Sequence, residues 1–291
     1  MPVSVSDCPG PDLPVFGEHR EVCAFLMGLM AGWPEGDPFT WLDLGCGEMR
    51  VLDAARHALF DKHRARIRYV GYDRAEPSLE ACRRLSGCGF ARWDVLAGDL
   101  SELRVKLGSD WSGFRLITLT NTLHEVEPEY VAGLLCDCLT MLEPCGGVFL
   151  AFDVEWLKEP ESEPGSATWS SAGIAQVIEA LFEGLGWPPQ EAVARWRTHS
   201  TTGWTVIVSR EAEGEGDRAA AREAMDRAVR EALRDRRDEC ARVLKEYADR
   251  RERTAVGNGI DSLRPDEKAE VQRNLWLHYG LSRFSSWIDA G

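Results

Sequence analysis

The residues whose types and spacing first suggest chemistry lie in the stretch TWLDLGCGEMRVLD, residues 40–53. An apolar run ends at Asp43 and Leu44, and Gly45, Cys46 and Gly47 follow just before a helical pattern begins. Glycine lets a backbone approach a ligand closely because it has no Cβ atom. The first amide groups of a helix have no partner within that helix. The stretch therefore predicts a strand, a tight turn and a helix that together hold a nucleotide-like ligand.

A dinucleotide-binding turn normally carries the pattern G-x-G-x-x-G, in which the third glycine allows the helix to pack closely on the strand. Arg50 stands at that third position here. The missing glycine disfavours a nicotinamide-dependent oxidoreductase.

Two carboxylates continue the pattern further along the chain. Asp73 ends the segment IRYVGYD, and Asp99 follows in LAGDLSEL, next to Leu100. A carboxylate at the tip of a second strand can accept hydrogen bonds from both hydroxyl groups of a ribose. We expect Asp99 to accept from an adenine amino group, with Leu100 against the ring. Asp94 is the alternative if the third strand ends earlier, and each Asp taken alone is also a common helix cap or turn residue.

Alternating strand and helix patterns position these residues. Strands are expected at 40–44, 67–72, 90–95, 116–120 and 147–153, and helices at 50–62, 78–85, 128–142 and 171–185. Alternation of this kind predicts a parallel sheet covered by helices on both faces. The segments AVARWRTHS and GWTVIVSR, joined by a short TTG, predict an antiparallel hairpin at one edge.

The chain divides into three parts by composition. Residues 1–38 form a leader and a helix, residues 39–210 carry the alternating pattern, and residues 211–291 form a C-terminal helical extension. In the extension, apolar residues recur every three or four positions with an interruption around Arg236 and Arg237, which predicts one or two amphipathic helices. A GNG sequence at residues 257–259 ends this helical stretch, and Pro265 lies in the first turn of another helix. The apolar tail is expected to pack on the main domain or on a second subunit.

Composition limits the classes of partner. The net charge of -14 disfavours binding to nucleic acid, because like charges must be overcome before contact. The extension is nearly neutral, with 16 Lys and Arg against 18 Asp and Glu, as expected for a solvated helical face or a partner contact. No signal sequence and no run of about 18 apolar residues is present, which predicts a cytoplasmic protein outside the membrane.

The cysteines point the same way. Nine cysteines at irregular spacing suit a reducing compartment. Cys136 and Cys138 have no second pair or nearby histidine, so we expect them to pack in the core and expect no metal site.

Five motifs in order resemble those of class I S-adenosylmethionine-dependent methyltransferases. They are LDLGCGEMRVL, VGYDRAEPSL, AGDLSEL, FRLITLTNTLHEV and LTMLEPCGGVFLAFD, within residues 39–210. The resemblance implies an α/β fold with a seven-stranded, mostly parallel sheet in the order 3-2-1-4-5-7-6, strand 7 being antiparallel. It also implies S-adenosyl-L-methionine as cofactor and S-adenosyl-L-homocysteine as product. The cofactor-binding residues that it implies are Asp43, Gly45, Cys46 and Gly47 around the methionine part, Asp73 and Arg74 at the ribose, Asp99 and Leu100 at the adenine, and Thr120 and Asn121 beside the sulfonium.

Two motifs known from DNA methyltransferases bear on which atom accepts the methyl group. The chain lacks an Asn/Asp-Pro-Pro-aromatic sequence after the fourth strand, which disfavours methylation of exocyclic amines in DNA. The pair Pro144-Cys145 resembles the nucleophile motif of cytosine C5 methyltransferases, but it occupies the loop where the family usually has Pro-Gly-Gly. We therefore expect no catalytic role for Cys145.

His124 is the candidate catalytic residue. The segment around it is similar to small-molecule O-methyltransferases of the plant phenolic type, in which the histidine of a His-Asp-Trp sequence is the base; here Glu125 and Val126 replace the last two residues. Histidine suits this role because its ordinary pKa is near neutrality. His124 could instead position the substrate or pack locally.

Four further residues are candidates for contact with the substrate. Glu125, together with Glu127, could pair with an amine, and Trp156 and Trp169 could stack on a flat substrate or pack against the C-terminal helices. The prediction is a methyltransferase for a small-molecule acceptor. The alternatives are a protein or RNA methyltransferase that docks its substrate through residues 211–291, and a non-catalytic cofactor-binding protein; a homodimer or a protein partner through the same residues is also open.

Overall fold

The computed structural model describes residues 19–108, 111, 113–144, 146–156, 167–197, 202–210, 217–253 and 263–290. Several sequence predictions lie outside these residues. They are the leader before residue 19, Cys145, most of the loop between Trp156 and Trp169, the hairpin turn at 198–201 and the GNG sequence at 257–259.

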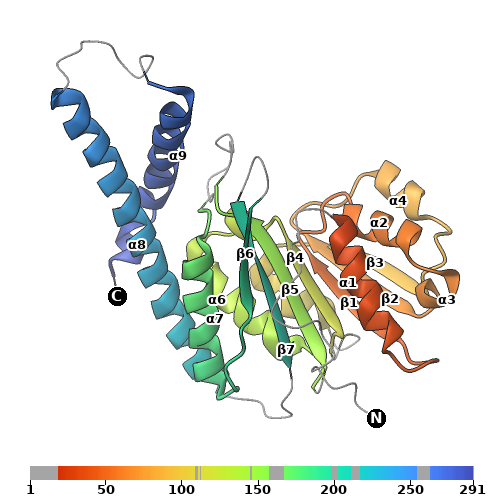
Figure 1. Ribbon diagram of the computed structural model, residues 1–291. Helices are drawn as coiled ribbons and strands as arrows, with labels where there is room; N and C mark the ends of the chain where they lie inside the picture. Colours follow the sequence, from red (N-terminus) through yellow and green to blue (C-terminus); the bar gives the residue numbers. More distant parts are fainter. Residues whose placement is uncertain are drawn as a thin grey trace.

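A seven-stranded sheet runs through the molecule in the order β3-β2-β1-β4-β5-β7-β6 (Figure 1). The strands are β1 (Phe39–Leu44), β2 (Ile67–Asp73), β3 (Arg92–Ala97), β4 (Leu116–Thr120), β5 (Gly147–Val154), β6 (Val193–Arg197) and β7 (Thr202–Arg210). β7 pairs antiparallel with both β5 and β6, and the other pairs are parallel. The predicted strand order and the antiparallel strand 7 are confirmed.

Helices cover both faces of this sheet. The helices are α1 (His19–Ala31), α2 (Arg50–Ala58), α3 (Asp61–Arg64), α4 (Leu79–Leu85), α5 (Leu103–Leu107), α6 (Pro128–Met141), α7 (Ser171–Leu185), α8 (Arg218–Arg253), α9 (Pro265–Ser282) and α10 (Ser285–Ile288). Neighbouring strand residues point to opposite faces, so Trp41 joins a cluster with α1, α2 and α4, whereas Leu42 joins one with α6, α7 and α8. The two clusters form the core.

Two predicted elements differ from the structure by more than one residue at a boundary. The helix expected at 50–62 is divided into α2 and α3, because Leu59 adopts an extended conformation and buries its side chain between them. β3 begins and ends two residues later than the prediction of 90–95. The second difference matters for function, because it decides which acidic residue follows the end of the strand.

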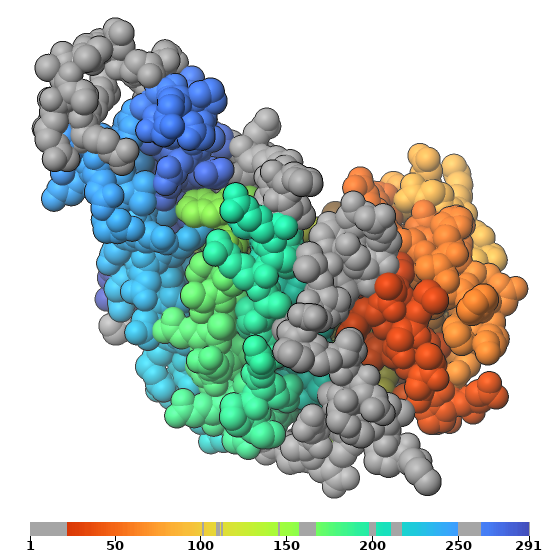
Figure 2. Space-filling view, viewed as in Figure 1, coloured from red at the N-terminus to blue at the C-terminus, as the bar shows by residue number. Residues whose placement is uncertain are grey.

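The C-terminal extension shares the core of the sheet domain. The first half of α8 lies along α6 and α7, where Met225, Val229 and Leu233 are buried in the same cluster as the sheet residues. The second half of α8 and the adjacent α9 project beyond the sheet (Figures 1 and 2). α8 is one continuous helix of 36 residues. Of the two alternatives, one helix or two, the structure has one, and the polar gap in the apolar spacing does not break it because Arg236 turns inward and is 7% exposed. Among the described residues, no helix has the length and apolar character that crossing a membrane requires.

Candidate active site

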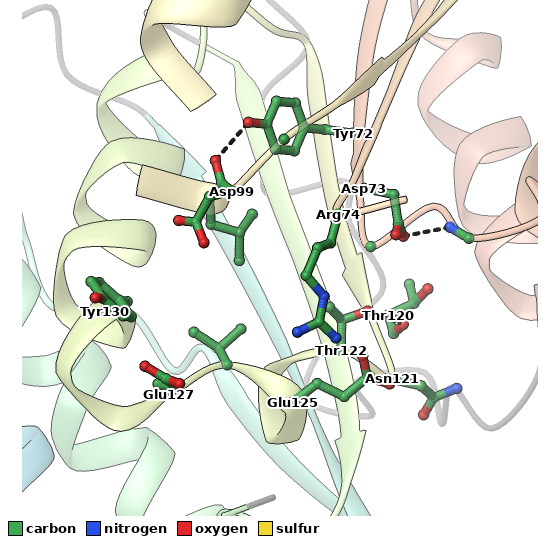
Figure 3. Close-up of a pocket in the computed structure, with 15 residues that line it drawn as sticks. Tyr72, Asp73, Arg74, Asp99, Thr120, Asn121, Thr122, Glu125, Glu127 and Tyr130 are labelled. Carbon is green, nitrogen blue, oxygen red and sulfur yellow. Dashed lines mark hydrogen bonds between the residues drawn. The ribbon is translucent and has the colours of Figure 1, made fainter. Parts of the chain in front are cut away.

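A pocket of about 460 Å³ opens at the carboxyl ends of β1, β2, β3 and β4. The chain order of the strands reverses between β1 and β4, and ligands of open α/β sheets bind at such a switch point. The sticks in Figure 3 converge on this space from the loops that follow the four strands. The lining residues are Gly45, Gly47, Tyr72, Asp73, Arg74, Gly98, Asp99, Leu100, Thr120, Asn121, Thr122, Glu125, Val126, Glu127 and Tyr130.

The glycine turn after β1 forms one wall. Gly45 has a φ angle of 66°, and a Cβ atom there would lie 2.2 Å from Oγ1 of Thr122, so this position combines a left-handed backbone with a close approach. Gly47 donates its N–H to Oδ2 of Asp73 at 2.8 Å. Met49 also has a positive φ angle, of 56°, and its side chain is fully buried. The turn is thus held by contacts to the ends of β2 and β4.

Asp73 stands at the end of β2 and points into the pocket (Figure 3). Besides the Gly47 contact, its Oδ1 accepts the N–H of Ala75 at 3.1 Å. Each carboxylate oxygen has two lone pairs, so these bonds orient the group and leave it able to accept more. The side chain of Arg74 extends across the pocket toward Thr122 and Glu125 (Figure 3).

Asp99 follows β3 by two residues and lines the pocket, as does the neighbouring Leu100. Its carbonyl accepts a hydrogen bond from the Tyr72 hydroxyl at 2.6 Å, which holds the loop in place. Burial and the nearby carboxylates of Glu102 and Asp99 raise the pKa of Tyr72 to about 12, so the hydroxyl remains a donor at neutral pH. Asp94 lies within β3 beside Arg92 and is not among the described residues that line the pocket.

Two residues expected at the cofactor lie beneath the pocket wall instead. Asp43 is 1% exposed and accepts hydrogen bonds from Tyr69 at 2.9 Å and from Thr118 at 2.7 Å. Burial raises the pKa of Asp43 to about 6, although these two bonds oppose the rise. Cys46 is buried against Gly71, and burial raises its thiol pKa well above the ordinary value. Both residues support the glycine turn from below.

His124 lies on the short helical turn Leu123–Glu125 after β4 and is 5% exposed. Its Nδ1 is 2.7 Å from Oδ1 of Asp153, and its backbone N–H donates to Oδ2 of the same carboxylate at 3.0 Å. The structure therefore pairs His124 with a carboxylate at the end of β5. Glu125, the next residue, lines the pocket, whereas His124 is not found among the lining residues that the structure describes.

The two tryptophans expected at the substrate lie elsewhere. Trp169 is 1% exposed in the core, where its carbonyl accepts the indole N–H of Trp204 at 3.0 Å. Trp156 is half-buried beneath the guanidinium group of Arg236. In the described part of the chain neither tryptophan lines the pocket, so the geometry supports packing for both.

Sequence reasoning missed several lining residues, namely Tyr72, Gly98, Thr122, Val126 and Tyr130. Each is adjacent to, or one helical turn from, a residue that was expected; Tyr72, Gly98, Thr122 and Val126 lie inside the quoted motifs but were given no role, and Tyr130 lies outside them. Thr122 is the clearest case, because its contact with Gly45 depends on the pairing of β1 with β4.

The pocket has a strongly acidic lining. Four carboxylates, those of Asp73, Asp99, Glu125 and Glu127, face one guanidinium group, that of Arg74, among the described lining residues. Such a lining favours a ligand with positive charge and opposes a pyrophosphate, which dinucleotide sites bind at a helix N-terminus. No group of three His, Cys, Asp or Glu side chains suited to a metal ion occurs in the described part of the chain.

No protein-family model and no curated protein matches the chain. Among solved structures, the chain is similar to an O-methyltransferase family protein from Burkholderia thailandensis, with 16% identity, coverage of 67% of this chain and 56% of that chain, and a TM-score of 0.45. The CurJ carbon methyltransferase shows 11% identity, coverage of 67% and 54%, and a TM-score of 0.47. The mitomycin 7-O-methyltransferase MmcR shows 18% identity, coverage of 65% of this chain and 54% of that chain, and a TM-score of 0.42. The chain thus spans little more than half the length of these three proteins, and similarity at this level does not bear on function.

Proposed function

We propose that this protein is an S-adenosylmethionine-dependent methyltransferase that acts on a small-molecule acceptor. The observation that carries the proposal is the pocket itself. The ends of β1, β2 and β3 bring the glycine turn, Asp73 and Asp99 to one cavity, and these two carboxylates with Glu125 and Glu127 make its described lining acidic.

The donor set fits this cofactor. Its ribose hydroxyls can donate to Asp73, which the Gly47 and Ala75 amides orient, and its adenine amino group can donate to Asp99 beside the apolar Leu100. Its sulfonium and ammonium groups are positively charged, as the lining favours. The cofactor contains no phosphate. This agrees with a glycine turn that departs from the dinucleotide pattern G-x-G-x-x-G, since Arg50 stands at the third glycine position.

When bound, the cofactor supplies an activated methyl group for an in-line displacement. The contribution of the chain is alignment, because holding the two reactants in line removes much of the entropic barrier. Thr120 and Asn121, at the end of β4, line the pocket. The proposal assigns them a place beside the sulfonium. Asn121 has a φ angle of 50°, an unusual conformation for a residue other than glycine and one that is often found at functional sites.

The finer hypothesis is a hydroxyl acceptor whose proton passes to His124. The Asp153 carboxylate supports it, because an Nδ1–H donated to a carboxylate leaves Nε2 as the basic nitrogen and stabilises the imidazolium that forms. The burial of His124 opposes direct contact with the acceptor. His124→Gln separates the two outcomes: a base predicts loss of turnover with unchanged cofactor affinity, whereas a packing role predicts retained turnover and lower stability.

Transfer of labelled methyl groups tests the proposal. The protein would be incubated with labelled S-adenosylmethionine and with metabolite, protein and RNA fractions of a cell extract, with Asp99→Ala as the inactive control. Label in the metabolite fraction is expected, with little in the control. Label confined to protein or RNA would instead support docking through residues 211–291, and cofactor binding without any transfer would support a non-catalytic role.

A further inference from the structure

Arg236 has an unusual environment for a charged residue. It lies in the middle of α8, and its side chain is 8% exposed. Its guanidinium carbon lies 3.9 Å from the centroid of the Trp156 ring, Nη1 is 3.0 Å from Oε2 of Glu239, and Nη2 donates to the carbonyl of Glu155 at 3.2 Å. Burying a charge is unfavourable unless hydrogen bonds and opposite charge compensate. The pair with Glu239 lies within α8, whereas the contacts with Trp156 and the Glu155 carbonyl join α8 to the end of β5.

The end of β5 is tied to its surroundings at Glu155. Its N–H donates to the carbonyl of Thr202 at 2.9 Å, and its carboxylate accepts the N–H of Ser171 at 2.9 Å and pairs with Arg195 at 2.8 Å. On the side of the C-terminal extension, Arg236 holds the carbonyl of Glu155 and the face of Trp156. Arg273 of α9 lies over the same ring at 5.8 Å.

This strand end carries the carboxylate that binds His124. Asp153 lies two residues before Glu155, and its Oδ1 accepts the N–H of Val154 at 2.7 Å as well as contacting Nδ1 of His124. Only Val154 separates Asp153 from Glu155, so the chain links this carboxylate directly to the contacts at Glu155, and the pairing of Asp153 with Trp204 in β7 adds a second constraint. His124 in turn precedes Glu125 in the pocket lining. The contacts form one continuous path of packed and hydrogen-bonded groups from α8 to the pocket.

We propose that Arg236 is a positioning residue through which the C-terminal extension sets the end of β5, and with it the geometry of the His124–Asp153 pair. The consequence for catalysis rests on the proposed function, whereas the effect on His124 itself does not. On this proposal the C-terminal extension contributes to the geometry of the candidate active site.

Arginine suits this position better than lysine. A planar guanidinium group can stack on an aromatic ring and donate in its own plane at the same time, whereas an ammonium group makes a point contact. Arg236→Lys keeps the charge but loses this combination, so we expect it to fall between wild type and Arg236→Met.

Arg237 provides a matched control. It is the next residue of α8, and it binds Asp289 through two 2.9 Å hydrogen bonds and Ser285 at 3.2 Å. These contacts hold α10 and do not involve the end of β5. Arg237→Met thus removes a paired guanidinium group from the same helix without touching the proposed path.

The experiment measures the His124 side chain directly. The imidazole resonances would be assigned by comparison with His124→Gln and recorded for wild type, Arg236→Met, Arg236→Lys and Arg237→Met, without methyl donor. A downfield, slowly exchanging Nδ1 proton is expected in wild type and in Arg237→Met. In Arg236→Met we expect this signal to shift or to be lost by exchange with water, and in Arg236→Lys to shift less.

Folding and cofactor binding are measured in parallel. Urea unfolding checks that each variant is folded, and affinity for S-adenosylhomocysteine is expected to stay within about threefold of wild type, which is below 0.7 kcal/mol. If Arg236→Met does not fold, Trp156→Leu interrupts the same contact from the other side. An unchanged Nδ1 signal in a folded Arg236→Met or Trp156→Leu variant, or an equal change in Arg237→Met, would overturn the proposal. Failure of S-adenosylhomocysteine to bind wild type would reject the proposed function but leave this result standing.

Discussion

Replacement of Gly45 by alanine tests whether the glycine turn has the geometry described. The backbone of Gly45 has a φ angle of 66°, and a left-handed conformation costs an L-residue roughly 1–2 kcal/mol. The added Cβ atom would also lie 2.2 Å from Oγ1 and 2.4 Å from Cγ2 of Thr122. Rotation of Thr122 about χ1 cannot remove both contacts, because a β-branched side chain exchanges one heavy atom for the other. Overpacking of this kind costs roughly 1–3 kcal/mol, so the total is about 2–5 kcal/mol.

Gly186 is the matched control for this substitution. It has a φ angle of 64° at the end of α7, and a Cβ atom there would meet no described heavy atom within 4 Å. Gly186→Ala therefore carries the conformational cost alone, about 1–2 kcal/mol. Adding Thr122→Ala to Gly45→Ala removes the two closest atoms, and we expect a favourable coupling of about 1 kcal/mol or more in the double-mutant cycle.

Urea unfolding followed by tryptophan fluorescence measures the stability of Gly45→Ala, Thr122→Ala, the double variant and Gly186→Ala, and calorimetry measures their affinity for S-adenosylhomocysteine. We expect Gly45→Ala to lose more stability than Gly186→Ala, and to lose affinity, because Thr122 lines the pocket. Equal losses of stability in the two single variants, with no coupling between Gly45 and Thr122, would refute the close contact of the turn with the end of β4.

Three further predictions concern single side chains. Burial raises the pKa of Asp43 to about 6 from its ordinary 3.8, so this group contributes most to stability below pH 3.8 and loses that contribution as the pH rises through 6. Between pH 4 and 7.5, urea unfolding should therefore show the stability of Asp43→Asn rising by roughly 2–3 kcal/mol relative to wild type. A difference in stability that stays constant over this pH range would contradict the prediction. Asp99→Ala should weaken S-adenosylhomocysteine binding by about 10-fold to 150-fold, from loss of a hydrogen bond to a charged group, whereas Asp94→Ala should leave it unchanged; the reverse order in calorimetry would restore Asp94. Trp169→Ala should lower the free energy of unfolding by about 3–5 kcal/mol, because the side chain is buried in the core. Near-wild-type stability would contradict the packing role and favour contact with the substrate.

The architecture could be predicted from sequence because it depends on local signals. Strand and helix periodicities indicate the alternating α/β architecture, and the sheet order observed is the one that the resemblance of the motifs implies. The glycine turn, Asp73 and Asp99 meet in one pocket because parallel strands share a carboxyl edge. Whether Asp94 or Asp99 lines the pocket could be read only from the structure, since it depends on a difference of two residues in the end of β3. Contact of Asp99 with adenine stays a prediction.

Burial could not be predicted in the same way, because it depends on which distant elements pack together. Asp43 was expected at the cofactor from its place in the motif, but Tyr69 and Thr118 enclose it beneath the turn. The apparent break at Arg236 looked like a polar interruption in sequence. In the structure Arg236 is buried against Trp156, which lies 80 positions earlier in the chain and is brought to α8 only by the fold.

The most direct test of the central claim is calorimetric titration of wild type and Asp73→Ala with S-adenosylhomocysteine, with NAD⁺ as the comparison ligand. We predict micromolar binding to wild type, a loss of about 100-fold or more in Asp73→Ala because two hydrogen bonds to a carboxylate disappear, and no binding of NAD⁺. Absence of heat with wild type, or equal affinity in Asp73→Ala, would contradict the assignment of this pocket to S-adenosylmethionine.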